Sequence, residues 1–140
     1  YLIQATSGAS GPKLREGDRQ VPEGIYKLIG FNPNSAYHLS MKVNYPNAFD
    51  LKHAKQEGRE EPGTNIFIHG KAVSIGCLAM GDPAIEELFV LAHDVKLENI
   101  TIIIAPSDPA TEGLTPPADS ADWVEELYQD ITAAVSEIRV

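Results

Sequence analysis

Two side chains that together could perform nucleophilic catalysis, His69 and Cys77, stand eight positions apart in the sequence. A cysteine attacks through its thiolate, and a neighbouring histidine is the usual base that removes the thiol proton. Gly70 and Gly76 stand at the two ends of the connecting segment, so the chain can fold back and bring the two side chains together. Gly76 also leaves room for a substrate carbonyl beside backbone N–H groups, which could stabilise an oxyanion.

The spacing alone does not distinguish a catalytic cysteine from a structural one. Cys77 is the only cysteine in the chain, and a lone cysteine commonly acts as a small buried apolar side chain. In an exported protein, an unpaired cysteine is instead a free thiol. Because the chain has four histidines, one of them can lie near the cysteine by chance. The spacing by itself therefore favours the structural interpretation.

The length and composition are those of one ordinary globular domain. The chain has 140 residues, of which 43% are hydrophobic and 22% charged, and this predicts a single domain over residues 1–140. No apolar run approaches the roughly 20 residues that cross a bilayer, and the chain contains no signal peptide. Because it begins at Tyr1 in what reads as the interior of a strand, we expect a removed targeting segment upstream and an exported protein.

The charge distribution limits the partners that we expect. Residues 1–81 hold nine basic and seven acidic residues, whereas residues 82–140 hold two basic and thirteen acidic ones. An acidic half does not neutralise phosphates, which excludes nucleic acid as a partner. No set of His, Cys, Asp and Glu has metal-ligand spacing, and no glycine-rich phosphate-binding motif is present. We therefore expect neither a metal nor a cofactor.

The elements that must position the two reactive side chains follow from periodicity. Alternation and β-branched runs predict strands over residues 1–6, 25–31, 36–43, 65–69 and 99–105. Residues 44–64 show no periodicity and predict a long loop. Helical spacing predicts a helix over residues 83–94 with Asp82 as its N-cap, and a C-terminal helix over about 120–139. The apolar stripe expected on that last helix is Trp123, Leu127, Ile131, Ala134 and Ile138. The sequence thus predicts an α+β, β-rich fold in which His69 ends a strand and Cys77 precedes a helix.

The residues around the reactive pair also form a family motif. The string I-H-G-x-x-x-S-x-G-C-x-A-M over residues 68–80 resembles the active-site signature of the YkuD-type L,D-transpeptidases, which are enzymes of bacterial peptidoglycan. Further matches, in order along residues 5–95, are similar to the YafK-like branch of that family. They include Gly11-Pro12-Lys13, Glu16-Gly17-Asp18, Pro22-Glu23-Gly24, His38-Leu39-Ser40 and Tyr45-Pro46-Asn47.

The resemblance implies a fold and a set of roles. The expected fold is a YkuD-type catalytic domain with mixed sheets in a sandwich-like core and flanking helices. Cys77 matches the nucleophile that forms a thioester, and His69 matches the general base. Ser74, Gly76 and Gly70 match the turn that shapes the oxyanion pocket and orients the imidazole. The backbone N–H groups of Cys77 and Gly76 are expected to face the oxyanion.

Three residues of one predicted strand are candidates for substrate binding. His38 and Ser40 lie on its polar face, and the family branch also carries a histidine at the first of these positions. Tyr37 shares the other face with Leu39 and Met41 and is expected in the core. Lys13 and Arg15, in a glycine-rich loop, could bind a carboxylate, but solvated charge is the favoured interpretation.

Two departures from the broader family concern the substrate. The family usually has a long insert between the histidine and the cysteine, whereas only seven residues separate them here. Ala79 stands where the family usually has an arginine. An arginine there would contact a substrate carboxylate, so recognition must be arranged differently.

These observations predict a cysteine-dependent peptidoglycan acyltransferase, an L,D-transpeptidase, that acts on stem peptides and is monomeric and periplasmic or cell-envelope located. One alternative is a hydrolase, an amidase or endopeptidase, with the same site. Another is a non-catalytic cell-wall-binding module, in which Cys77 would be buried and inert. A catalytic thiol should instead react in the native state with a pKa below about 8.5.

Overall fold

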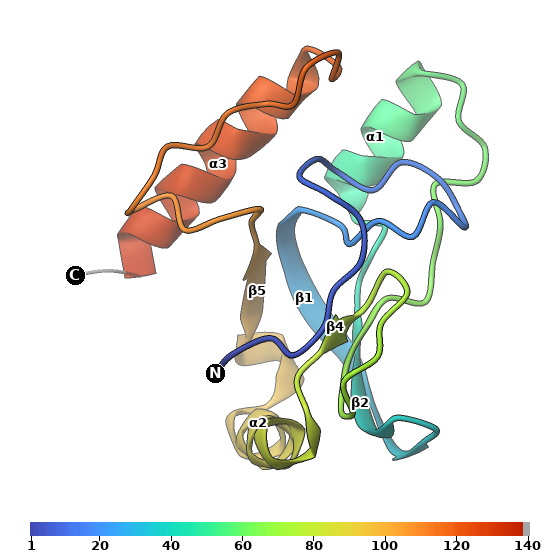
Figure 1. The fold of residues 1–140 in the computed structure, drawn as a ribbon, viewed down its shortest axis with the longest axis vertical. Helices are drawn as coiled ribbons and strands as arrows, with labels where there is room; N and C mark the ends of the chain where they lie inside the picture. The colour runs from blue at the N-terminus through green and yellow to red at the C-terminus, as the bar shows by residue number, and fades with distance from the viewer. Residues whose placement is uncertain (139–140) are drawn as a thin grey trace.

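The computed structural model describes residues 1–138, and its strands form one five-stranded mixed sheet with the order β4-β3-β2-β1-β5 (Figure 1). The strands are β1 (Gly24–Ser35), β2 (His38–Val43), β3 (Phe67–His69), β4 (Leu78–Ala79) and β5 (Thr101–Ile104). The β3–β4 pair is parallel and the other three pairs are antiparallel. Together with the helices, this sheet confirms the α+β class predicted from the sequence.

The long strand β1 explains why the structure has one sheet where separate sheets were expected. Its residues 24–27 pair with β5, whereas residues 28–35 pair with β2. The register between β1 and β2 shifts twice along this length, which marks bulges that bend a strand. Because β1 pairs with both β2 and β5, it joins these strands in one continuous sheet.

Three α-helices and one 3₁₀ turn complete the described chain. They are α1 (Ala48–Gln56), α2 (Asp82–Val95), the turn η1 (Leu97–Asn99) and α3 (Trp123–Ile138). Figure 1 shows α2 at one end of the molecule, with α1 and α3 at the other. None of the helices within residues 1–138 is long and apolar enough to cross a membrane.

The prediction of a continuous loop over residues 44–64 is wrong, because this segment contains α1. The Asn47 side chain accepts a hydrogen bond from the Asp50 N–H, and the Asp50 carboxylate accepts one from the Asn47 N–H, each at 3.0 Å. This reciprocal capping box starts the helix. The buried residues of α1 are Asp50, His53 and Ala54. Because two of these three are polar, the helix has no apolar stripe for periodicity to detect.

Other predicted boundaries also shift. Residues 1–6 form only an isolated bridge between Ala5 and Ala79 rather than a strand. The N-cap of α2 is Gly81, and Asp82 is the first helical residue. The strand expected to end at residue 31 continues to Ser35. The helix expected over about 120–139 is α3, and its predicted last residue lies outside the described residues.

The core lies against the sheet in two clusters. The larger joins the sheet and α2, and its buried members are Tyr26, Leu28, Met41, Val43, Tyr45, Ile66, Ile68, Leu78, Ile85, Ala92 and Ile104. The smaller lies under α3, and its buried members are Val124, Leu127, Tyr128 and Ile131. Trp123 packs against the smaller cluster as expected, but Ile138 is 69% exposed, so the predicted stripe is wrong at its end.

The buried carboxyl group of Asp50 predicts a pH-dependent stability. Burial raises its pKa from the ordinary 3.8 to about 6. The folded state therefore takes up this proton more readily than the unfolded state, so stability from this group is present below pH 3.8 and is lost as the pH rises to about 6. At 1.36 kcal/mol per pKa unit, the loss amounts to up to about 3 kcal/mol.

Asp50→Asn should remove this dependence, because one oxygen, Oδ2, accepts from both Tyr26 and Asn47, and an amide oxygen can do the same. We expect the thermal midpoint of the variant to rise relative to wild type as the pH increases from 4 to 6.5. Asp130→Asn, at an exposed aspartate, is the control. A constant difference across this pH range would contradict the prediction.

Candidate active site

The pairing of the two shortest strands brings His69 and Cys77 into one neighbourhood. Ile68 pairs with Leu78 across the parallel β3–β4 ladder, and both side chains enter the core. His69 directly follows Ile68, and Cys77 lies in the bend directly before Leu78. If Cys77 continues the line of β4, strand spacing and rise per residue predict a Cα separation of about 8 Å. This separation suits contact between an imidazole and a thiol.

The imidazole of His69 is held in one orientation. Its Nδ1 lies 2.6 Å from the carbonyl oxygen of Gly70. A carbonyl can only accept, so Nδ1 carries the proton and the other ring nitrogen, Nε2, is free to accept one. The ring of Tyr37 lies against it, with centroids 4.6 Å apart. His69 is only 3% exposed, so its ring is held in place beneath the tyrosine.

The thiol of Cys77 is partly buried and uncharged at rest. Its Sγ donates to the carbonyl of Asn65 over 3.8 Å. Burial raises the pKa of the thiol, and the backbone N–H of Phe67 and the ammonium of Lys13 oppose that rise only in part. This direction is opposite to the acidic thiol expected from the sequence. A nucleophilic role for this thiol would therefore require a base that takes its proton.

The raised pKa predicts how native Cys77 reacts with iodoacetamide. Only the thiolate is alkylated, so we expect slow modification at pH 7 and a rate that rises through a midpoint above the roughly 8.5 of a solvated thiol. Since the chain has one cysteine, mass spectrometry of the intact protein measures the rate without ambiguity. The urea-unfolded protein is the reference, and a native midpoint below the unfolded one would contradict the assignment.

The two backbone N–H groups that were expected to face the oxyanion donate hydrogen bonds to serine hydroxyl groups instead. The Cys77 N–H donates to Ser74 Oγ over 3.0 Å, and the Ser74 hydroxyl donates to the Cys77 carbonyl. The Gly76 N–H donates to Ser7 Oγ over 2.7 Å. Gly76 has φ of 84°, a conformation that favours glycine. If these amides form the oxyanion hole, a substrate oxygen must replace the hydroxyl partners.

Gly70 is required by close packing on both sides. A Cβ atom there would lie 2.7 Å from Asp82 Oδ1 and 2.7 Å from the Tyr37 carbonyl oxygen. The same carboxylate accepts from the Lys71 N–H over 2.8 Å, which ties the first turn of α2 to the segment after β3. The glycine therefore lets α2, the β1–β2 turn and His69 meet at one point.

The three candidates for substrate binding have different surroundings. Tyr37 is 44% exposed over the His69 ring, so the expectation that it lies in the core is wrong. Ser40 is buried and pairs directly with His69 across the β2–β3 ladder. His38 instead lies against α2, where its Nε2 is 2.7 Å from Glu86 Oε1. Tyr37 and Ser40 therefore neighbour His69, whereas His38 contacts a helix.

Ala79 has no access to a substrate. It is fully buried, and its backbone pairs with the N-terminal segment: its carbonyl accepts from the Gln4 N–H over 2.7 Å, and its N–H donates to the Ala5 carbonyl. Because Ala79 is fully buried, a larger side chain at this position would require its surroundings to rearrange.

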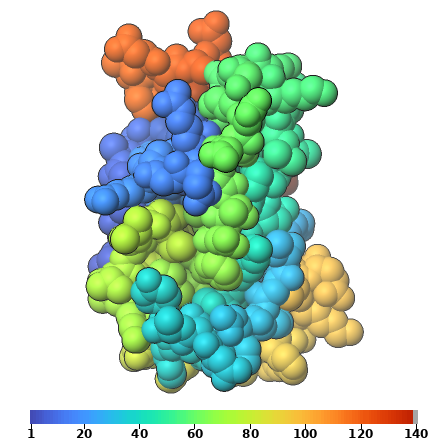
Figure 2. Space-filling view, turned by 90° about the vertical axis from the view of Figure 1, so that its right-hand side faces the viewer, coloured from blue at the N-terminus to red at the C-terminus, as the bar shows by residue number. Residues whose placement is uncertain are grey.

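Sequence reasoning missed the residues that surround the reactive pair from other segments. Lys13 is 7% exposed and ion-paired with Asp18 at 2.6 Å, so the expectation that it is solvated is wrong. Ser7 contacts the Cys77 turn from the N-terminal segment. Figure 2 shows that segment (blue), the segment near residues 70–80 (yellow-green) and the β1–β2 turn (cyan) side by side on one face. A hydroxyl residue flanked by small residues, as in Thr6-Ser7-Gly8, was the only signal for Ser7.

The fold is that of an L,D-transpeptidase catalytic domain. Residues 3–104 match the model of the YkuD family, described as the L,D-transpeptidase catalytic domain, and the chain belongs to that family. It is also 40% identical over 91 residues to the Escherichia coli (strain K12) protein YafK, named as an L,D-transpeptidase. That match covers 64% of this chain and 35% of YafK, so the chain spans about a third of this relative.

Solved structures with the same fold include the helical cell shape determining protein Pgp2 from Campylobacter jejuni. This structure matches with a TM-score of 0.55 and 19% identity, over 94% of this chain and 58% of Pgp2. A single-residue variant of Pgp2 matches with a TM-score of 0.57 and 20% identity, over 96% of this chain and 43% of that one. At this identity the likeness establishes the fold.

Proposed function

We propose that this chain is a cysteine acyltransferase that acts on the stem peptides of peptidoglycan, with Cys77 as the nucleophile and His69 as the general base. The observation that carries the proposal is the fixed tautomer of His69: the Gly70 carbonyl accepts a hydrogen bond from Nδ1–H, which leaves Nε2 unprotonated and able to act as a base. Family membership supports the substrate class. Because peptidoglycan lies in the cell envelope, the proposal includes export and action there as a monomer.

The proposed reaction has two halves. In the first, His69 Nε2 accepts the thiol proton while Cys77 Sγ attacks the carbonyl carbon of the donor amide. The C–N bond breaks, the imidazolium gives its proton to the leaving amine, and the acyl group remains on sulfur as a thioester. In the second, Nε2 accepts a proton from an amine or water molecule that attacks the thioester, the C–S bond breaks and the sulfur recovers the proton.

The acceptor determines the outcome of the second half-reaction. An amine from another stem peptide gives a crosslink, whereas water gives hydrolysis by the same residues. Tyr37 and Ser40 are the residues that we propose for substrate contact, because both neighbour His69. The buried Ala79 supports a carboxylate recognition that differs from that of family members with an arginine at this position.

Purified muropeptides incubated with wild type and Cys77→Ala, in ¹⁸O-labelled water with an added amine acceptor, test the proposal by mass spectrometry. We expect wild type to convert the muropeptides and the variant to leave them unchanged. A label in the product would identify hydrolysis, and the mass of the acceptor would identify transpeptidation. Equal conversion by the variant would exclude Cys77 as the nucleophile, whereas binding without conversion by both proteins would favour a wall-binding module.

A further inference from the structure

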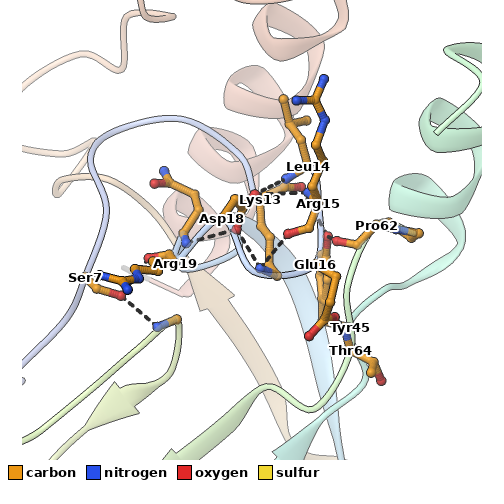
Figure 3. A network of polar contacts seen from close by, with 12 residues as sticks. Ser7, Lys13, Leu14, Arg15, Glu16, Asp18, Arg19, Tyr45, Pro62 and Thr64 are labelled. Carbon is orange, nitrogen blue, oxygen red and sulfur yellow. Dashed lines mark hydrogen bonds and ion pairs between the residues drawn. The ribbon is translucent and has the colours of Figure 1, made fainter. Parts of the chain in front are cut away.

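The hydroxyl group of Ser7 connects the Cys77 turn to a distant loop. Ser7 Oγ accepts from the Gly76 N–H over 2.7 Å and donates to the Arg19 carbonyl over 2.6 Å (Figure 3). A hydroxyl group can donate only one hydrogen bond, and Ser7 donates it to the Arg19 carbonyl. The lone pair that faces Gly76 is therefore fixed in direction. One side chain thus links the N-terminal segment, residues 15–20 and the residue immediately before Cys77.

The Arg19 carbonyl that orients Ser7 is itself held rigidly. Asp18 accepts from the backbone N–H groups of Leu14, Arg15 and Gln20, each at 3.0 Å, and from Lys13 Nζ at 2.6 Å. Figure 3 shows these groups converging on the Asp18 carboxylate. Arg19 follows directly with φ of 57°, in the left-handed region. The loop therefore presents its carbonyl to Ser7 in one direction.

The loop of residues 13–20 also contacts the segment whose carbonyl accepts from the Cys77 thiol. A Cβ atom on Gly63 would lie 2.6 Å from Lys13 Cε, so the buried lysine stem packs closely under that glycine. Glu16 accepts from the Thr64 N–H over 3.0 Å, and the next residue, Asn65, offers its carbonyl to Cys77 Sγ. Both sides of the thiol are thus attached to one loop, through Ser7 on one side and Thr64 on the other.

We propose that Ser7 is a positioning residue for the nucleophile: it holds the Gly76 amide, and through it Cys77, in the geometry needed for attack. This inference rests on the proposed role of Cys77. Displacing a reacting atom by about 1 Å can reduce a rate by about 100-fold. In Ser7→Ala the Gly76 N–H loses its acceptor, while Cys77 keeps its contacts with Ser74 and Asn65. We expect the turn to move outward, away from the N-terminal segment.

The experiment compares wild type with Ser7→Ala, Ser7→Thr and Ser10→Ala. Ser10 is an exposed serine of the same segment and is the matched control. We expect Ser7→Ala to lower kcat for muropeptides by about 10-fold to 100-fold with little change in KM, and Ser7→Thr, which keeps the hydroxyl, to restore most of it. Because burial raises the pKa of the thiol, an outward movement should also lower the pH midpoint of alkylation and speed alkylation at pH 7 several-fold.

Slower turnover together with faster alkylation is the signature of a displaced nucleophile. A lower thermal midpoint with unchanged kcat and alkylation would make Ser7 purely structural and overturn the inference. So would equal losses in Ser7→Ala and Ser10→Ala, or failure of the threonine variant. If wild type converts no muropeptide, the proposed function fails, but the alkylation midpoints of the folded variants still test the positioning of the thiol.

Discussion

His69→Gln is expected to lower kcat for muropeptide conversion by about 10²-fold to 10⁴-fold, the usual contribution of a general base. Glutamine is similar in size and can donate to the Gly70 carbonyl, but its amide does not accept a proton at neutral pH. The effect should be large because the resting Cys77 is an uncharged thiol with a raised pKa. Without a base, attack must use the small thiolate fraction present in solution.

The measurement is kcat against pH for wild type, His69→Gln and His93→Gln. His93 is exposed on α2 and is the control for loss of an imidazole. Without its base the variant should depend on the thiolate, so its rate should climb steadily with pH where that of wild type levels off. Thermal midpoints check that the buried substitution leaves the fold intact. A variant that is folded and retains wild-type activity near neutral pH would remove His69 from the mechanism.

The sequence singles out the candidate pair, His69 and Cys77, because its signal is local. His69, Gly70, Ser74, Gly76 and Cys77 stand within nine consecutive residues, and the motif that they form needs no knowledge of distant contacts. The strands that alternate cleanly were also predicted, since one face of each packs on the core. What these signals share is that neighbours in the sequence determine them.

Features that depend on contacts between distant segments were missed. The N-terminal segment pairs with β4 through Ala5, and β4 is too short for any periodicity to show. Tyr37 was expected in the core from alternation, but it precedes β2, and the turn directs its ring onto His69. Helix α1 was missed because its buried face carries Asp50 and His53.

The state of the thiol also depends on distant residues. Burial raises its pKa, and the charge of Lys13, which is far from Cys77 in the sequence, lowers it in part. A motif identifies which cysteine is reactive, but it does not give the dielectric surroundings of that cysteine. The expectation of a low thiol pKa came from cysteine nucleophiles in general. The raised pKa of Cys77 comes from its burial in this fold.

Gly70→Ala is the second substitution with a large expected effect. Its Cβ atom would meet a carboxylate oxygen of Asp82 and the backbone oxygen of Tyr37, both at 2.7 Å, and the Ile85 side chain at 3.0 Å. The backbone oxygen cannot give way without moving the β1–β2 turn, and the carboxylate is held by the Lys71 N–H. We expect a loss of stability of about 1–3 kcal/mol, typical of overpacking.

The same substitution should reduce activity beyond its effect on folding, because the Gly70 carbonyl sets the His69 tautomer. Any movement that releases the Nδ1 proton lets the proton transfer to Nε2, which then cannot act as a base. Gly113→Ala, where a Cβ atom would meet nothing within 4 Å, is the matched control. The two effects separate when kcat is measured well below the thermal midpoint of the variant. An alanine variant with wild-type kcat there would show that His69 keeps its orientation without this carbonyl, and the ring contact with Tyr37 would then be the one to test next.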